Sequence, residues 1–370
     1  MPEVERTIAK RRGAAAGPTL VVVGGVHGNE PAGVRAACRV VGDVPDRAIH
    51  GEVVALAGNT RALAENKRYL VRDLNRQWSA DRLADLDAGR VPDDAESREA
   101  RELRAALDAA VAAARGPVYF LDLHTTSAEG VPFGLIGDTQ RHRAFAARFP
   151  LPVILGLEEQ VDGVLAEYMS ARGATTLSVE GGQHANPGSQ GNLEAVVRVA
   201  LWAAGVASRD DVPSLDAAIA LLERARGHLP HLIEVLSRHA ITDEHEFRME
   251  PGFANIQRAR AGELLARDRR GEIRAPHDGM VLLPLYQAQG DEGFFYGREV
   301  SPLRQRVCGA LRRYRLDALL PLLPGVRGGR DELEVAPGAA DLYPSGLFSL
   351  FGYRQIRPGE RGLVYRRRSP

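Results

Sequence analysis

The amino-acid sequence predicts an α/β protein in which helices sandwich a mixed, largely parallel sheet, followed by a smaller β-rich C-terminal domain. Two observations predict the sandwich: short β-branched runs alternate with longer amphipathic runs over the first 205 residues, and no internal repeat replaces this alternation. A third observation predicts the β-rich part, because strand-like runs between residues 231 and 300 alternate with Gly, Pro and Asp turns.

The elements of the first part follow from its hydrophobic pattern. Apolar β-branched runs predict strands at residues 20–23, 53–56, 118–123 and 176–179. Apolar residues at helical spacing predict helices at residues 33–41, 95–114 and 193–204. Because parallel strands need a long crossover connection, the alternation of strands and helices favours parallel pairing.

The chain of 370 residues is longer than one typical domain of about 150 residues. The polar segment SRDDVPS predicts a linker before a helix at residues 215–225. We therefore expect a first domain at residues 1–207 and a small capping domain at 208–300. Residues 301–370 hold an arginine-rich amphipathic helix at 303–322 and a Gly/Pro-rich tail. This extension is compatible with lining a pocket, with a contact between copies in a homo-oligomer, or with neither.

The composition excludes several classes of partner. The 48 basic and 48 acidic residues cancel, so no net charge attracts the chain to nucleic acid or to an anionic membrane. No apolar run has the length of a signal peptide core or a membrane span. Cys38 and Cys308 offer neither a disulfide framework nor a thiolate metal site, and a reducing cytoplasm is the simplest setting.

Metal-ligating residues follow three of the predicted strands. His27 and Glu30 follow the first strand in the segment GGVHGNE, where Gly28 permits a tight turn. His124 ends a second strand in the segment LDLH. Glu180 ends a third strand and precedes a pair of glycines. Ligands bind at the carboxyl edge of open α/β sheets, where these residues would meet. Two histidines and one glutamate form a catalytic zinc set with a position open for water, and the fourth group is then free to act as a base.

Each of these motifs is weak by itself, because a histidine in a loop is usually only a hydrogen-bonded residue. Together, however, the pieces GGVHGNE, NTRALAENKRYLVRDLNR, LDLHTTS and VEGG resemble the succinylglutamate desuccinylase and aspartoacylase family, related in fold to the zinc carboxypeptidases. The resemblance covers residues 20–188. It implies one Zn²⁺ per chain, with His27, Glu30 and His124 as ligands and Glu180 as the general base.

The segment RYLVRDLNR concentrates arginines next to an amide side chain. Guanidinium groups bind carboxylates in a bidentate manner and stabilise oxyanions. The family resemblance implies that Arg68 polarises the scissile carbonyl and that Asn75 and Arg76 bind the substrate carboxylate. The alternative is a surface patch neutralised by Asp73. Asp122 lies two residues before His124 on the same face of a strand, and we expect its carboxylate to orient that imidazole.

Two further features of the resembled family are matched less closely. An arginine that reads the acyl group precedes the base in aspartoacylases, and Arg172 lies near that place but at another spacing. A tyrosine of the second domain closes the family's pocket, and we expect Tyr286 rather than Tyr296 in this role. Three other histidines lack a second ligand at useful spacing and are interpreted as turn or surface residues: His184, His245 and His277.

These observations predict a zinc-dependent hydrolase that cleaves the amide bond of a small N-acyl amino acid or a similar carboxylate. A peptide-cleaving zinc carboxypeptidase and a non-catalytic zinc-binding relative remain the alternatives. The absence of a G-x-S-x-G elbow and of a nucleophilic cysteine agrees with direct attack by water. The segment IRAPHDGMVLLP resembles a biotinyl or lipoyl hairpin, but no lysine follows Lys67, which excludes a carrier function.

Overall fold

The computed structural model describes residues 4–157, 160–287, 290–340, 342–343, 347–359 and 362–367. Its contacts divide the chain into two units. The first comprises Met1–Ile136 with His142–Glu299, and the second comprises Gly137–Arg141 with Val300–Pro370. The predicted first and second domains thus fall into one unit, while the predicted extension from residue 301 begins next to the boundary at Glu299.

The first unit is built on an 11-stranded sheet with the order β1-β3-β2-β4-β7-β5-β6-β8-β14-β13-β10. Its centre is parallel, because β2 pairs in parallel with β3 and β4, and β4 pairs in parallel with β7. The described strands of this sheet are β1 Thr7–Arg12, β2 Thr19–Gly24, β3 Glu52–Ala57, β4 Val118–Thr126, β5 Phe133–Ile136, β6 Val153–Leu155, β7 Thr175–Gln183, β8 Leu232–Ala240, β10 Gln257–Ala259, β13 Gly279–Leu282 and β14 Glu292–Glu299.

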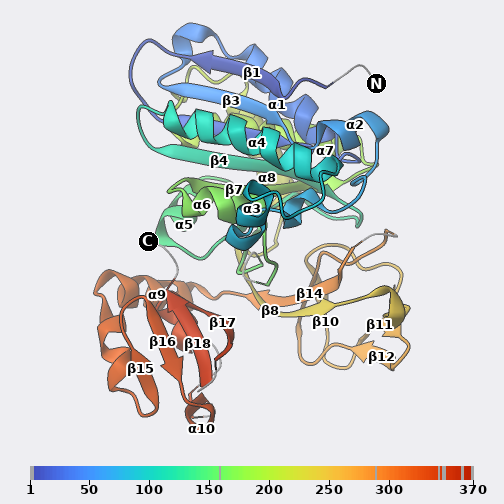
Figure 1. Cartoon of the computed structure of the whole chain (residues 1–370), viewed down its shortest axis with the longest axis vertical. Helices are drawn as coiled ribbons and strands as arrows, with labels where there is room; N and C mark the ends of the chain where they lie inside the picture. The colour runs from blue at the N-terminus through green and yellow to red at the C-terminus, as the bar shows by residue number, and fades with distance from the viewer. Residues whose placement is uncertain are drawn as a thin grey trace. The chain divides into compact units, whose positions relative to one another are not determined.

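Helices cover both faces of this sheet, with α4 in front of it and α1 and α7 behind it in Figure 1. Every residue of β2 and β3 is buried, as expected for strands covered on both faces. The predicted α/β class, with its mixed, largely parallel sheet, is therefore confirmed. The helices are α1 Ala32–Asp43, α2 Thr60–Glu65, α3 Ala80–Asp87, α4 Ala95–Ala112, α5 Gln140–Ala146, α6 Leu165–Ala171, α7 Gly188–Ala203 and α8 Leu215–Arg226, with short 3-10 turns η1 Asp46–Ala48, η2 Leu74–Arg76 and η3 Asp243–His245.

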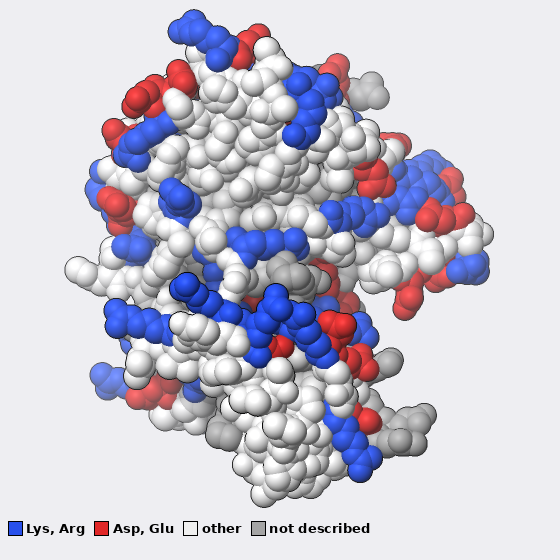
Figure 2. Space-filling view, turned by 90° about the vertical axis from the view of Figure 1, so that its left-hand side faces the viewer, with Lys and Arg blue, Asp and Glu red and all other residues white. Residues whose placement is uncertain are grey.

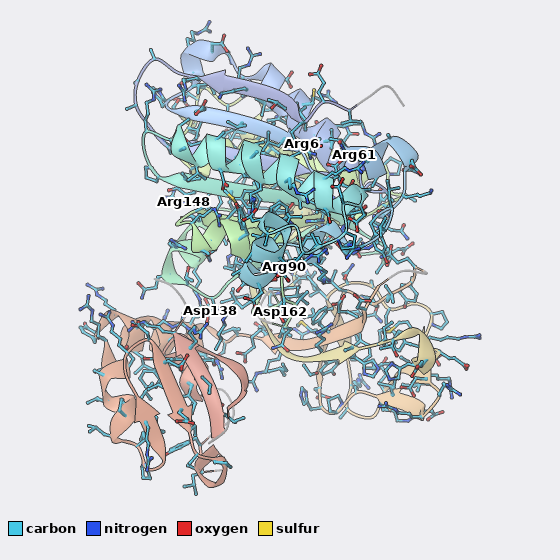
Figure 3. The ribbon with its side chains drawn as sticks, viewed as in Figure 1. Arg6, Arg61, Arg90, Asp138, Arg148 and Asp162 are labelled. Atoms are coloured by element: carbon cyan, nitrogen blue, oxygen red, sulfur yellow. The ribbon has the colours of Figure 1, made fainter. Side chains whose placement is uncertain are left out.

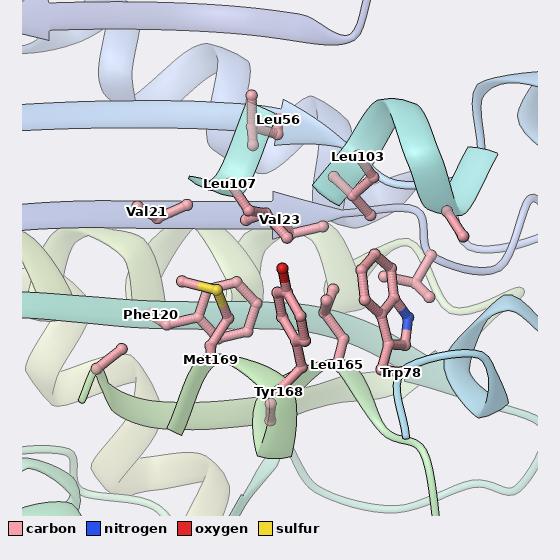
Figure 4. Packing of buried hydrophobic residues seen from close by; sticks show 14 of the residues in the cluster. Val21, Val23, Leu56, Trp78, Leu103, Leu107, Phe120, Leu165, Tyr168 and Met169 are labelled. Atoms are coloured by element: carbon pink, nitrogen blue, oxygen red, sulfur yellow. The ribbon is translucent and has the colours of Figure 1, made fainter. Parts of the chain in front are cut away.

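A hydrophobic core fills the space between the central strands and the helices α4 and α6 (Figure 4). Trp78 and Tyr168 pack with ring centroids 5.1 Å apart, next to Leu103, Leu107 and Phe120. Full burial of one such side chain contributes about 1.5–3 kcal/mol. This core fixes the strands whose carboxyl ends carry the polar residues considered below.

A buried carboxylate fixes α4 relative to the N-terminal end of α2. Glu99 of α4 pairs with Arg6 and Arg61, both labelled in Figure 3. It also accepts hydrogen bonds from the backbone N–H groups of Thr60 and Arg61. A buried charge is tolerated when it is paired and hydrogen-bonded in this way.

The β-rich part of the first unit continues the main sheet across the predicted linker. β8 pairs in parallel with β6, and β14 pairs antiparallel with β8. A second, 3-stranded sheet has the order β12-β11-β9 and comprises β9 Arg248–Met249, β11 Leu264–Asp268 and β12 Gly271–Arg274. The shared sheet is the reason why residues 208–299 do not separate from the sandwich.

The second unit contains a 4-stranded antiparallel sheet with the order β15-β16-β18-β17. The single helix expected at residues 303–322 is interrupted, because Arg315 adopts a left-handed φ of 52° and a 3-10 segment follows. The described elements are α9 Pro302–Arg313, η4 Leu316–Leu322, β15 Val326–Gly328, β16 Glu332–Val335, α10 Pro337–Ala340, α11 Leu347–Leu350, β17 Tyr353–Gly359 and β18 Gly362–Arg367.

The surface carries both signs of charge. On the face shown in Figure 2, arginine and lysine side chains lie next to aspartate and glutamate side chains in several places. No helix in the described part of the chain is long and apolar enough to cross a membrane. Cys38 is exposed and Cys308 is buried.

Candidate active site

The carboxyl ends of three central strands bring four of the predicted residues together. His27 and Glu30 lie in the loop after β2, His124 lies near the end of β4, and Glu180 lies on β7. His124 and Glu180 are register partners in the parallel ladder between β4 and β7. All four residues line one pocket of the first unit.

His27, Glu30 and His124 form a buried cluster that could hold a metal ion. The Nδ1 atom of His27 lies 2.8 Å from Oε1 of Glu30, and the Nδ1 atom of His124 lies 3.2 Å from Oε2. One ligand atom from each residue lies within 4.8 Å of the other two. Two imidazole nitrogens and one carboxylate oxygen are ligands that zinc accepts, so this donor set fits the ion.

Each histidine also faces a carboxylate on the opposite side of its ring. The Nε2 atom of His27 lies 3.1 Å from Asp73, and the Nε2 atom of His124 lies 3.0 Å from Asp122. Such partners orient ligand imidazoles and increase their basicity. Asp122 lies where we expected it, whereas sequence reasoning interpreted Asp73 only as a neutralising charge. A signal for Asp73 is its place inside the arginine block of the resembled family.

The electrostatic environment distinguishes Glu30, which belongs to this cluster, from Glu180, which lines the same pocket. Burial opposes ionisation of Glu30, but the charges and hydrogen bonds of His27 and His124 hold the pKa of this carboxyl well below its usual value. Burial raises the pKa of Glu180 to about 8, although the nearby His124 and Arg68 oppose this shift. The Oε2 atom of Glu180 is buried and has no hydrogen-bond partner among the described residues. Of these two carboxyls, Glu180 therefore has the higher proton affinity.

Arg68 is positioned by contacts with the loop after β2, which carries His27 and Glu30. The N–H of Gly28 donates to the carbonyl of Arg68 at 3.1 Å. A Cβ atom on Gly28 would lie 2.1 Å from the carbonyl carbon of Ala62, so this glycine is needed for close approach rather than for a left-handed turn. The guanidinium of Arg68 contacts Asp73 at 3.1 Å and lies 3.6 Å from Glu30, facing the cluster.

The rest of the arginine block is organised by Glu96, in the first turn of α4. Its carboxylate accepts hydrogen bonds from the side chain of Asn59 and from three consecutive backbone N–H groups: Leu70, Val71 and Arg72. Glu96 is fully buried. Sequence reasoning missed this residue, because the contact joins segments about 25 positions apart.

Asn75 and Arg76 follow in η2 and also line the pocket. The side-chain oxygen of Asn75 accepts from the N–H of Leu165 at 2.9 Å, which connects η2 to α6. Arg76 pairs with Glu292 at 3.2 Å. The remaining wall of the pocket is largely apolar, with the side chains of Leu135, Leu157, Val161, Val164, Leu283 and Phe295. The pocket therefore combines polar groups at its base with an apolar wall, as small-molecule sites do.

Residues 16–199 match the family model described as the succinylglutamate desuccinylase/aspartoacylase catalytic domain. The chain belongs to this family. The matched segment includes the three residues of the metal cluster, Glu180 and the arginine block. No curated protein sequence matches the chain.

Solved structures agree with this family in fold. They include a succinylglutamate desuccinylase/aspartoacylase from Rhodobacter sphaeroides, with 18% identity and a TM-score of 0.58 over 79% of this chain and 88% of that chain. The product-bound ectoine utilization protein EutE from Ruegeria pomeroyi has 20% identity and a TM-score of 0.56 over 77% and 87%. The succinylglutamate desuccinylase from Chromobacterium violaceum has 20% identity and a TM-score of 0.54 over 77% and 85%.

Two residues expected from the succinylglutamate desuccinylase/aspartoacylase resemblance lie outside the pocket lining. Arg172 pairs with Asp108 at 3.1 Å and stacks over the ring of Tyr168, so the structure does not bring it to the site. The hydroxyl of Tyr286 donates to the carbonyl of Glu250 at 2.7 Å and accepts from the N–H of Phe253. The Tyr286 side chain is therefore held by the β-rich part, and Tyr296 is buried there as well.

His184 lies in the pocket, although sequence reasoning left it as a turn or surface residue. Its Nδ1 atom lies 2.7 Å from the hydroxyl of Thr125, the residue after His124. Burial lowers the pKa of His184, which favours the neutral imidazole. His184 follows the end of β7, and the pairing of β4 with β7 shifts register between Glu180 and Gln183, so the spacing from Glu180 gave no simple signal for this residue.

Proposed function

We propose that this chain is a zinc-dependent deacylase that cleaves the amide bond of a small N-acyl amino acid or a similar carboxylate. The observation that carries the proposal is the position of Glu180. Its carboxyl lies in the same buried pocket as the cluster of His27, Glu30 and His124, but it is not part of that cluster. A site that only binds a metal has no use for such a base.

The chemistry of the proposed reaction divides between an ion and the side chains. His27, Glu30 and His124 would hold one Zn²⁺, which when bound acts as a Lewis acid and lowers the pKa of water toward neutrality, to about 7 in well-studied enzymes. Glu180 accepts the proton of the attacking water and returns it to the leaving amine. Glu180 has an ionisable carboxyl for both steps, and its Oε2 atom has no hydrogen-bond partner among the described residues.

Arg68 is suited to stabilise negative charge on the carbonyl oxygen during attack. Its guanidinium lies in the pocket, 3.6 Å from Glu30, and remains positively charged beside Asp73. A fixed donor in a buried site stabilises a developing oxyanion more than water does. Asn75 and Arg76, which also line the pocket, are suited to bind the substrate carboxylate.

Two measurements test this proposal. The purified protein should contain about one zinc per chain by elemental analysis, since the three residues supply a catalytic ligand set. A panel of N-acyl amino acids and short peptides should then show hydrolysis of the former; preferred cleavage of peptides would favour a carboxypeptidase instead.

The variant Glu180→Gln tests the assigned base. Glutamine keeps the shape of the side chain but cannot accept the proton, so kcat should fall by roughly 10²- to 10⁴-fold while zinc content stays at the wild-type level. The matched control is Glu223→Gln in α8, an exposed position outside the pocket. Loss of zinc from Glu180→Gln would make this residue a ligand. Full activity of the variant would remove the base from the mechanism.

A further inference from the structure

Glu292 pairs with Arg76, the arginine that is suited to bind the substrate carboxylate. It is the first residue of β14, lines the pocket and has a side chain that is only 14% exposed. Both of its carboxylate oxygens lie 3.2–3.3 Å from Nη2 of Arg76. A second arginine, Arg238 of β8, donates from its Nη2 to the same carboxylate at 3.0 Å. Glu292 therefore bridges two arginines from different parts of the first unit.

The charges of this bridge do not cancel. Two guanidinium groups share one carboxylate, which leaves a formal excess of one positive charge beside the pocket. Arg76 uses its Nη1 atom to bind the carbonyl of Asn75 at 3.0 Å, so Nη2 is the end that Glu292 takes. The Nε atom of Arg238 is buried and has no hydrogen-bond partner among the residues that the structure describes. The group of three thus carries a formal charge of +1 and is not neutralised by Glu292 alone.

The two arginines differ in what else holds them. The second contact of Arg238 is with a distant segment, from its Nη1 to the carbonyl of Gln160 at 2.9 Å. The second contact of Arg76 is only with its neighbour Asn75, inside the short turn η2. A ligand carboxylate that reaches Nη2 of Arg76 must take the place of Glu292 there. After this exchange Arg238 can still pair with Glu292, so the partly buried Glu292 carboxylate is not left without a counter-charge.

We propose that Glu292 is a specificity-determining residue that competes with the substrate carboxylate for Arg76, and that Arg238 is a positioning residue that acts by holding Glu292. The inference rests on the proposed function, in which Arg76 binds that carboxylate. It makes the free carboxylate of the substrate the group that is selected, because a neutral ligand does not compensate Arg76 for the loss of Glu292. Both residues lie beyond the segment 16–199 that matches the family model.

The first test compares the wild type with Glu292→Gln, using N-acetyl-L-alanine and its amide, N-acetyl-L-alaninamide, as probes in titration calorimetry. Removing the competing charge should tighten binding of the carboxylate by about threefold to thirtyfold, as expected for a partly exposed charge-assisted pair, and should leave the amide unaffected. If wild-type binding of the carboxylate is too weak to measure, the variant should reveal it. Equal binding to both proteins, or no binding to either, overturns the proposal.

A matched control is Glu234→Gln. This residue of β8 pairs with Arg298 of β14, on the same two strands as the proposed bridge but outside the pocket lining. It should bind the carboxylate probe as the wild type does. On the best substrate of the deacylase panel, Glu292→Gln should lower KM more than it changes kcat. A larger change in kcat than in KM contradicts the assigned role.

The second test separates positioning from direct contact. In Arg238→Ala, Glu292 has only Arg76 as a partner and competes more strongly, so carboxylate binding should weaken by about threefold or more. In the double variant with Glu292→Gln, the same change should have no effect. A persisting effect would show that Arg238 binds the ligand directly. These binding measurements need no turnover, so a failure of the deacylase assay alone would refute the proposed function without deciding the role of Glu292.

Discussion

At the scale of single residues, the candidate metal centre is oriented by carboxylates on both sides of each imidazole. His27 lies between Glu30 and Asp73, and His124 lies between Glu30 and Asp122. A flip of either ring would put its Cδ2 and Cε1 carbons in the places of Nδ1 and Nε2 and break both contacts. The Nδ1 atoms of both rings therefore face Glu30 as a consequence of the protein's own contacts.

The two pocket arginines are expected to differ in their kinetic effects. Arg76→Ala should raise KM by about 10- to 100-fold, because a charge-assisted contact with the substrate carboxylate is lost. Arg68→Ala should lower kcat by roughly 10²-fold, since its contact strengthens as charge develops on the carbonyl oxygen. Steady-state kinetics on the best substrate measures both values.

The comparison variant for this pair is Arg172→Ala. Its guanidinium pairs with Asp108 on the surface, and the contact should contribute little, so KM and kcat should stay within about twofold of the wild type. If Arg172→Ala raises KM as strongly as Arg76→Ala does, then Arg172 contributes to substrate binding.

At the scale of elements, the sequence predicted what local patterns determine. The four predicted strands lie within β2, β3, β4 and β7, because buried parallel strands appear as continuous apolar runs. The polar residues at the ends of these strands could be predicted because each one follows such an apolar run directly in the sequence. By contrast, Glu292 acts through contacts with residues 216 and 54 positions away, for which the sequence contains no local pattern. The helix expected at 303–322 was wrong at Arg315, where a left-handed residue ends it.

The segment between Arg68 and Arg76 depends on α4 for its shape. We expect Glu96→Ala to release the N–H groups of Leu70, Val71 and Arg72, which would then exchange with solvent at least about tenfold faster, as one lost hydrogen bond of about 1.4 kcal/mol implies. KM should rise, because Arg76 lies on the same segment. Hydrogen exchange followed by mass spectrometry measures the first effect.

Glu102→Ala is the control for this change. Glu102 belongs to the same helix and pairs with Arg61, but its side chain is 49% exposed and makes no contact with residues 70–72 in the described structure. Unaltered exchange in Glu96→Ala would mean that the loop keeps its shape without this carboxylate.

At the scale of the whole molecule, the two units are not separate stretches of chain. Residues 137–141, between β5 and the body of α5, belong to the second unit together with residues 300–370. Within that unit, Arg312 of α9 binds the carboxylate of Asp138 with both Nη atoms, at 3.0 and 2.6 Å. Arg312 also donates to the backbone carbonyls of Ser349 and Leu350, so one side chain joins three segments.

This arrangement predicts that the second unit depends on a residue supplied from the middle of the sequence. Asp138→Ala leaves the guanidinium of Arg312, whose side chain is 9% exposed, without its counter-charge, and removing one partner of a buried pair costs about 3–5 kcal/mol. Amide exchange in α9 should accelerate strongly, while deacylase activity should persist because Asp138 does not line the pocket. Glu332→Ala, which breaks the exposed pair with Arg366 in the same unit, should cost less than about 1 kcal/mol. Equal exchange of α9 in both variants would show that the Asp138 contact does not hold the unit together.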